Sequence, residues 1–161
     1  MDATKEEDVP QHDMRLQFSL ELPRDAALVR DARRTLDGAL AGAGVTEECR
    51  DDIRLALTEA CGNVVSHANL ASGYHIDVTV DEGECVIEVT DDGGGFDPNR
   101  VPPVEPVTPG DEPGHLKESG RGLQVLAAVV ERLDVVSVED TGTLVRFSKH
   151  LTWDPDKQRE P

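Results

Sequence analysis

The sequence predicts an α+β domain in which helices cover one face of a mixed, mostly antiparallel sheet. Alternation of apolar and polar residues predicts strands at 15–22, 74–81, 85–91, 134–139 and 143–151. Apolar residues at helical spacing predict helices at 25–41, 46–69 and 123–133. Two helices therefore follow the first strand, and a third helix separates two hairpins. This order is typical of a sheet whose helices pack on one face.

The first strand and the first helix are predicted from regular spacing. Four apolar residues alternate with polar ones from Arg15 to Leu22, and Pro23 should end the strand. The helix should begin near Asp25 and end at the Gly-Ala-Gly stretch at 42–44. Its inner face is expected to consist of Leu28, Ala32, Leu36 and Leu40.

The second helix carries an unusual polar stripe. Thr46 can cap its start, and the acidic residues that follow suit the positive end of a helix. Glu59, Asn63 and His67 then recur every four residues and should lie along one stripe. Taken alone, this stripe is best explained as the wet edge of an amphipathic helix.

The chain between 91 and 122 is rich in glycine and proline and cannot be regular for most of its length. A loop this long in a compact chain is usually functional or disordered. We expect a domain over 14–153 with a lid loop at about 97–119, and disordered tails at 1–13 and 154–161. The two hairpins should turn at Gly83 and at 140–142.

Composition excludes several classes of function. Asp plus Glu total 33 against 16 Lys plus Arg, a net charge of −17, which disfavours contact with nucleic acid and anionic membranes. Such a surface would attract a basic protein partner, or it only keeps the chain soluble. The three cysteines form no CxxC pair, so neither a disulfide framework nor a zinc site is expected. No apolar run or signal peptide stands out, so we expect a cytoplasmic protein.

Three motifs together indicate a nucleotide site. They are the stripe with Glu59 and Asn63, the Asp91-Asp92-Gly-Gly-Gly stretch, and Gly120-Arg121-Gly122-Leu123 at a helix start. An aspartate at a strand end can accept a hydrogen bond from the adenine amino group, and an amide oxygen can hold Mg²⁺ together with phosphates. A carboxylate one turn earlier could accept a proton, and a helix start offers N–H groups to phosphate. The loop between the glycine clusters could close as a lid.

This set of motifs resembles the GHKL superfamily of ATP-binding proteins, which includes gyrase, Hsp90, histidine kinases and MutL. EACGN (59–63) resembles the N box, DDGGGF (91–96) the DxGxG box and GRGL (120–123) the GxG box. The pattern E-A-x-x-N-x-x-x-H-A, the small size, the lack of a phosphoacceptor helix hairpin and the ending at 142–147 are most similar to anti-sigma-factor serine/threonine kinases of bacterial partner-switching modules. The resemblance spans about residues 15–150 and implies a two-layer α/β sandwich of the Bergerat type.

The resemblance also implies roles for individual residues, with ATP and Mg²⁺ as cofactors. Glu59 would be the general base, Asn63 the Mg²⁺ ligand and Asp91 the adenine-binding residue. The remaining cofactor-binding residues would be Gly93, Gly95, Gly120, Arg121, Gly122 and Leu123. Lys117 in the loop could also contact a phosphate, whereas His67 is expected only to fix the end of its helix.

The function implied is that of an ATP-dependent serine kinase that sequesters a sigma factor and phosphorylates an anti-anti-sigma (STAS-type) antagonist, with homodimers common among relatives. One alternative is an ATP- or ADP-binding regulator with weak or no catalysis, because the loop is proline-rich and acidic. Another is a detached histidine-kinase catalytic domain. Residues 91–99 do not match a calcium loop, and neither a dinucleotide fingerprint nor a P-loop is present.

Overall fold

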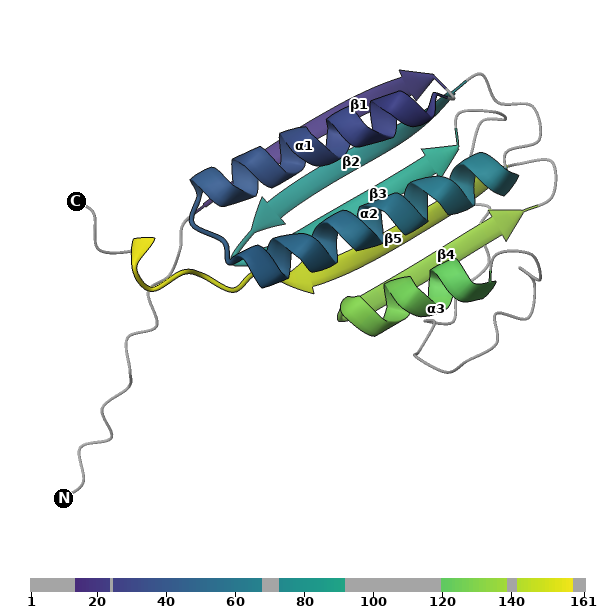
Figure 1. Cartoon of the computed structure of the whole chain (residues 1–161). Helices are drawn as coiled ribbons and strands as arrows, with labels where there is room; N and C mark the ends of the chain where they lie inside the picture. Colours follow the sequence, from purple (N-terminus) through teal and green to yellow (C-terminus); the bar gives the residue numbers. More distant parts are fainter. Residues whose placement is uncertain (1–13, 24, 68–72, 92–119, 139–141, 158–161) are drawn as a thin grey trace.

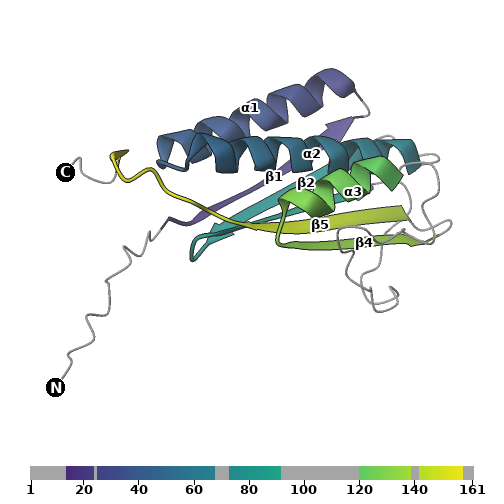
Figure 2. The same ribbon diagram turned by 60° about the horizontal axis from the view of Figure 1, so that its bottom comes forward.

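Three helices lie on one face of a five-stranded sheet, which confirms the predicted α+β class (Figure 1). The computed structural model describes residues 14–23, 25–67, 73–91, 120–138 and 142–157. The strand order is β1-β2-β3-β5-β4. The prediction allowed a mixed sheet, but every pairing between the described strands is antiparallel. Figure 2 shows the helical layer and the sheet as two separate layers.

Strand β1 (Leu16–Pro23) and helix α1 (Ala26–Gly42) follow the predicted pattern closely. Exposed and partly buried residues alternate along β1, which lies at the edge of the sheet beside β2 (Gly73–Asp81). Asp25 caps α1 by accepting a hydrogen bond of 2.9 Å from the backbone N–H of Ala27. Past the helix end, Gly44 adopts a φ of +89°, which favours glycine.

Helix α2 (Glu47–His67) crosses the middle of the sheet and forms much of the core. Thr46 precedes it, and its side-chain oxygen accepts a hydrogen bond from the N–H of Cys49 at 3.4 Å, as the cap prediction required. The predicted end at Asn69 lies just outside the described residues. The fully buried apolar residues of α2 include Ile53, Ala56, Leu57, Ala60, Cys61 and Val64.

The hairpin of β2 and β3 (Glu84–Asp91) turns where the sequence predicted, with Glu82 at a φ of 50° and Gly83 at 78°. The third helix differs from its prediction. Helix α3 spans Gly120–Val129 rather than 123–133, and β4 (Arg132–Val138) already contains Leu133. Leu133 pairs with Phe147 of β5 (Gly142–His150) and is buried. Pairing with β5 therefore places Arg132 and Leu133 in β4, although helical spacing alone assigned them to the helix.

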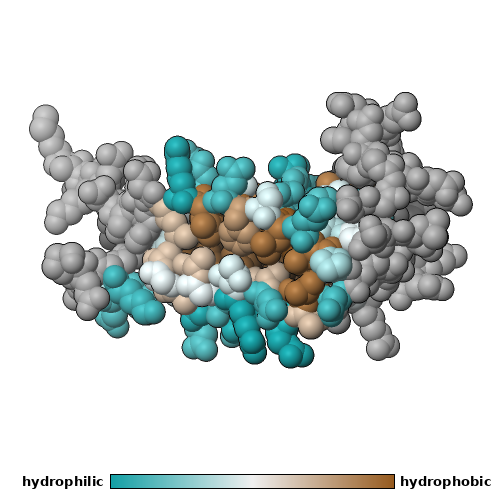
Figure 3. Space-filling model, turned by 90° about the horizontal axis from the view of Figure 1, so that it is seen from above, coloured by the Kyte–Doolittle hydropathy of each residue, from teal (hydrophilic) through white to brown (hydrophobic). Residues whose placement is uncertain are grey.

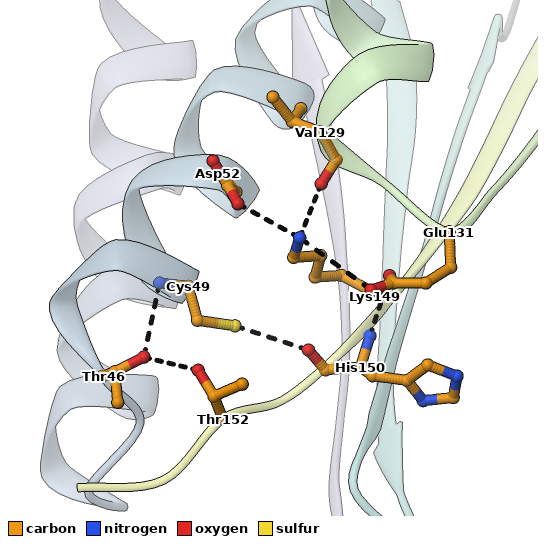
Figure 4. A network of polar contacts seen from close by, with 8 residues as sticks. All are labelled: Thr46, Cys49, Asp52, Val129, Glu131, Lys149, His150 and Thr152. Atoms are coloured by element: carbon orange, nitrogen blue, oxygen red, sulfur yellow. Dashed lines mark hydrogen bonds and ion pairs between the residues drawn. The ribbon is translucent and has the colours of Figure 1, made fainter. Parts of the chain in front are cut away.

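A polar network fastens the end of α3 to the rest of the fold (Figure 4). The ammonium group of Lys149 on β5 lies 2.7 Å from the carbonyl oxygen of Val129 and 3.1 Å from Oδ2 of Asp52. Glu131 accepts a hydrogen bond of 3.0 Å from the backbone N–H of His150. The network therefore ties α2, the C-terminal end of α3 and β5 together.

Apolar atoms form a band on the side of the molecule where β1 and α1 lie (Figure 3). The apolar residues of these elements pack against the core but remain partly exposed, because β1 has a neighbouring strand on one side only. They are Leu16, Phe18, Leu20, Leu22 and Val29. Among the described helices, none is long and apolar enough to cross a membrane.

Candidate functional site

The ends of four elements meet at one edge of the molecule. β3 ends at Asp91, β5 begins at Gly142, α2 completes its last turns there, and α3 begins at Gly120. Because β3 and β5 are antiparallel neighbours, the end of one strand lies beside the start of the other. Helix α2 contacts α3, β3 and β5. The described parts of the three predicted motifs therefore lie at the same edge of the fold, namely Glu59 and Asn63, Asp91, and Gly120 to Leu123.

Glu59 reaches from α2 toward the first turn of α3. A Cβ atom placed on Gly122 would lie 2.6 Å from Oε2 of Glu59, well inside van der Waals contact. Glycine at this position therefore allows the carboxylate to lie directly against the helix backbone. An acidic group beside the start of a helix is also favoured by the partial positive charge there.

Asn63 lies one turn beyond Glu59 on the same stripe of α2 and is only 4% exposed. Ala60 and Val64, which flank it on the helix, are fully buried. A buried amide among apolar neighbours is costly unless it is hydrogen-bonded, so its presence requires more explanation than a solvated helix edge. The interpretation of the stripe as a wet edge is therefore wrong for Asn63, while Glu59 remains half-buried.

Asp91 is the last residue of β3 and is 6% exposed. Alternation along β3 directs it toward the helical layer, together with the buried Ile87 and Val89. Gly142 lies beside it at a φ of +131°, and a Cβ there would lie 3.7 Å from Oδ2 of Asp91. A strand-end carboxylate is therefore held in a buried position with a glycine next to it.

Two further residues at this edge were given no role in the sequence analysis: Thr143, which belongs to the stretch 142–147, and Tyr74, which belongs to no motif. Thr90 pairs with Leu144, so the next residues on the two strands, Asp91 and Thr143, lie opposite each other, and Thr143 is buried. Tyr74 pairs with Asp91 across β2 and is also buried. The alternation of apolar and polar residues along β2 and β5 could have placed both residues on the inner face of the sheet. Only the strand register shows that they flank Asp91.

The neighbourhood of Tyr74 disfavours additional negative charge. Burial raises the pKa of Tyr74 to about 12, with smaller contributions from Cys61 and Asp25. Burial also raises the pKa of the Cys61 thiol to about 12, although Arg33 acts in the opposite direction. Both groups are therefore neutral at physiological pH, and Tyr74 contributes an uncharged residue opposite Asp91.

The structure places only part of the predicted set. Leu123 is buried in α3, and Gly120 begins that helix. The side chains of Arg121 and His67 are not among those described, although both residues belong to helices. The predictions for Gly93, Gly95 and Lys117, and for the lid loop at about 97–119, concern residues outside the described part of the chain.

The donor set can be compared with the requirements of Mg²⁺. Among the described residues, no group of three or more His, Cys, Asp or Glu side chains is placed to hold a metal ion. Mg²⁺ is commonly held by one or two protein oxygens together with substrate phosphates and water. The amide of Asn63, with Glu59 one turn away, fits that second arrangement and not a metal site formed by protein alone.

The fold and this edge define a class of protein, and comparison with known families agrees. The family described as the histidine kinase-like ATPase domain matches residues 22–149. The chain therefore belongs to the histidine kinase-like ATPase family, and the resemblance inferred from the three motifs is confirmed at that level.

Within this class, the chain is similar to proteins named serine-protein kinase RsbW. The protein from Halalkalibacterium halodurans is 30% identical over 139 residues, covering 85% of each chain. The one from Bacillus velezensis is 29% identical over 138 residues, covering 83% of this chain and 85% of the relative. Among solved structures, the RsbU and RsbW domains of Rv1364c from Mycobacterium tuberculosis have a similar fold, with a TM-score of 0.61 and 18% identity. That match covers 84% of this chain and 32% of the longer one.

Proposed function

We propose that the protein binds ATP with Mg²⁺ and acts as an anti-sigma factor and serine kinase. It would sequester a sigma factor and phosphorylate an anti-anti-sigma antagonist on serine. The observation that supports this proposal most directly is the meeting of Glu59, Asn63, Asp91 and Gly122 at one edge of the fold. Family membership and the similarity to serine-protein kinases named RsbW support the same function.

In the proposed nucleotide site, different elements would bind adenine, the phosphates and Mg²⁺. The buried Asp91 carboxylate would accept a hydrogen bond from the exocyclic amino group of adenine, with Thr143 and Tyr74 flanking it. The N–H groups at the start of α3 would face the phosphates. Asn63 would hold Mg²⁺ jointly with those phosphates, and the ion would neutralise part of their charge.

Glu59 is the proposed general base. Its carboxylate would accept the proton of the attacking serine hydroxyl, leaving the oxygen free to attack the transferred phosphoryl group. The close approach to Gly122 would hold the carboxylate beside the helix start, where the phosphates are proposed to lie. The rate would then depend on how well this carboxylate is positioned against the serine hydroxyl.

The proposed partners follow from charge and surface. A net charge of −17 suits a partner with a basic surface, as a DNA-binding sigma factor has. We also propose a homodimer, because the partly exposed apolar residues of β1 lie at an open sheet edge. Light scattering on the isolated protein tests that assembly. We propose that the protein is cytoplasmic.

Nucleotide binding is tested by the shift in melting temperature on adding Mg·ATP. Asp91→Asn should abolish most of the shift seen in the wild type. Asp81→Asn is a matched control, because Asp81 pairs with Arg15 at the other end of β2, and it should leave the shift unchanged. An unchanged shift in Asp91→Asn would show that the adenine assignment is wrong.

Catalysis is tested separately with labelled ATP and a candidate antagonist. Glu59→Gln should lower phosphotransfer by about 100-fold or more while the ATP-induced melting shift persists. Acid-stable phosphate indicates a hydroxyl acceptor, which phosphoamino-acid analysis should identify as serine, whereas acid-labile phosphate indicates a histidine kinase. ATP binding without transfer to any antagonist would support a regulator that acts by binding alone.

A further inference from the structure

A basic groove lies between α1 and α2, on a chain whose overall charge is strongly negative. The two helices run side by side over the sheet (Figure 1). The groove has a volume of about 450 Å³. It is lined by Arg30, Arg33, Arg34, Asp37, Arg54, Leu55 and Thr58. Four arginines against one aspartate give the lining a net charge of +3.

Some of the arginines in this groove already have partners. Asp37 accepts a hydrogen bond of 2.9 Å from Arg50, just outside the groove, and pairs with Arg54 at 3.5 Å. Arg33 donates a hydrogen bond of 3.0 Å to the hydroxyl of Thr58. These contacts join the two helices and occupy the one acidic side chain of the lining.

Arg30 and Arg34 are the two arginines that these contacts leave over. Both are exposed, and neither forms an ion pair or a hydrogen bond within the part of the chain that the structure describes. They lie four residues apart on one face of α1, where like charges destabilise a helix. Two adjacent guanidinium groups that repel each other and point into a groove favour a binding role over a purely structural one.

We propose that this groove binds an acidic segment of a partner protein. Guanidinium groups form paired hydrogen bonds with carboxylates, and arginines contributed by two helices suit an extended ligand better than a single small anion. Leu55 is 39% exposed in the lining and offers an apolar contact between the charges. The proposal stands independently of nucleotide binding.

The charge of the whole chain makes this groove selective. Beyond about 10 Å at moderate salt, charges on the surface are largely screened, so contact within the groove is governed by its own arginines. A partner that is acidic all over would still be repelled by the rest of the surface. The groove therefore favours a segment whose acidic residues are locally concentrated.

The groove also lies close in sequence to the candidate base. Thr58, which accepts from Arg33, in turn donates a hydrogen bond of 2.8 Å to the carbonyl oxygen of Arg54. Glu59 is the next residue and faces α3 on another side of the same helix. A partner segment in the groove would thus lie against the helical turn from which Glu59 projects.

Fluorescence anisotropy with a short labelled peptide rich in Asp, Glu and Leu tests the proposal. The double variant Arg30→Ala with Arg34→Ala should weaken binding at least tenfold. The control is Arg15→Ala with Arg132→Ala, which changes the net charge equally at side chains that are 77% and 72% exposed outside the groove. It should alter affinity by less than about twofold. Circular dichroism and the Mg·ATP melting shift check that the variants remain folded.

Four results would overturn the proposal. Equal weakening in both double variants would mean that only net charge matters, and absence of peptide binding to the wild type would rule the groove out. Inorganic phosphate that displaces the peptide at equal concentration would make the groove a small-anion site. Deletion of the acidic residues 2–13 tests the chain itself as the occupant. If that deletion tightens peptide binding tenfold, the terminus and not a partner fills the groove.

Discussion

Oε2 of Glu59 lies so close to the backbone of Gly122 that a Cβ atom at residue 122 would come within 2.6 Å of it. The contact joins the middle of α2 to the first turn of α3. The crowded atom is the tip of a flexible side chain, so the conflict caused by a larger residue would be relieved by moving Glu59 and not by unfolding the helix. A substitution at Gly122 therefore separates the position of the carboxylate from the stability of the fold.

Gly122→Ala is expected to lower phosphotransfer by about tenfold to 100-fold, because the displaced carboxylate can no longer accept the serine proton in place. The melting temperature should change little. Gly38→Ala on α1 is the control, since a Cβ there meets nothing within 4 Å, and it should raise stability without affecting transfer. Wild-type transfer rates in Gly122→Ala would contradict the importance of this contact.

Lys149→Met should destabilise the fold by about 1–3 kcal/mol, because it leaves the Val129 carbonyl and the Asp52 carboxylate without their ammonium partner. The free energy of unfolding in urea measures this loss. Arg146→Met removes an exposed pair with Glu88 and should cost no more than about 1 kcal/mol. Equal losses in the two variants would mean that the Lys149 network is no stronger than a surface ion pair.

The contribution of Lys149 should also depend on pH. Burial alone would lower its pKa, but the hydrogen bond to Asp52 and the charges of Glu131 and Asp52 raise it above the ordinary value of 10.5. The group therefore stabilises the fold fully below the pKa of the unfolded lysine, and this stabilisation is lost as the pH rises through the folded pKa. The stability gap between wild type and Lys149→Met should narrow in that alkaline range. A gap that is independent of pH would exclude a charge-dependent role.

The buried thiols should cause a second loss of stability at alkaline pH, which begins at a lower pH than the loss expected from Lys149. Burial raises the pKa of Cys61 and Cys85 from 9.0 to about 12. The unfolded thiols ionise first, so this contribution is complete below pH 9 and is lost as the pH rises toward 12. Cys85→Ala should show a shallower fall in unfolding free energy above pH 9 than the wild type. Val89→Ala, a buried truncation on the same strand, should keep the wild-type slope.

Tyr74→Phe is expected to leave stability unchanged or to raise it by up to about 1 kcal/mol. Its hydroxyl is buried and has no hydrogen-bond partner within the described residues, so the substitution removes a desolvated polar atom and keeps the ring. Urea denaturation provides the measurement, and Phe147→Leu, a buried truncation, should be clearly destabilising in the same assay. A loss above about 1 kcal/mol in Tyr74→Phe would reveal a hydroxyl partner.

The sequence was sufficient for the elements whose boundaries are set locally. Alternation from Leu16 to Leu22 predicted β1, and the capping residue Thr46 predicted the start of α2. The start of α1 near Asp25 was predicted from the spacing of its apolar residues, and the structure adds that Asp25 caps this helix. The end of α3 was predicted wrongly, because pairing between Leu133 and Phe147 depends on a strand that comes later in the chain. Local spacing contains no information about that partner.

In the candidate site, too, the sequence predicted what depends on local spacing and missed what depends on tertiary packing. Glu59, Asn63 and Asp91 could be selected because their residue types and spacing matched a chemical task. The burial of Asn63 and the neighbours of Asp91, namely Tyr74 and Thr143, depend on packing and strand register. The groove between α1 and α2 required the helices to be placed side by side before the arginines of both could be counted together.

Both ends of the described chain emerge away from the candidate site. β1 begins opposite Val80, at the far end of β2 from Tyr74. The segment after β5 returns to the residues that precede α2. There, Thr152 accepts a backbone hydrogen bond from Thr46, and Trp153 pairs with Val45. Lys157 then lies against Gly44 at the turn between α1 and α2. A reporter or a second folded unit could therefore be joined at either end without shielding the edge where Asp91 and Glu59 lie.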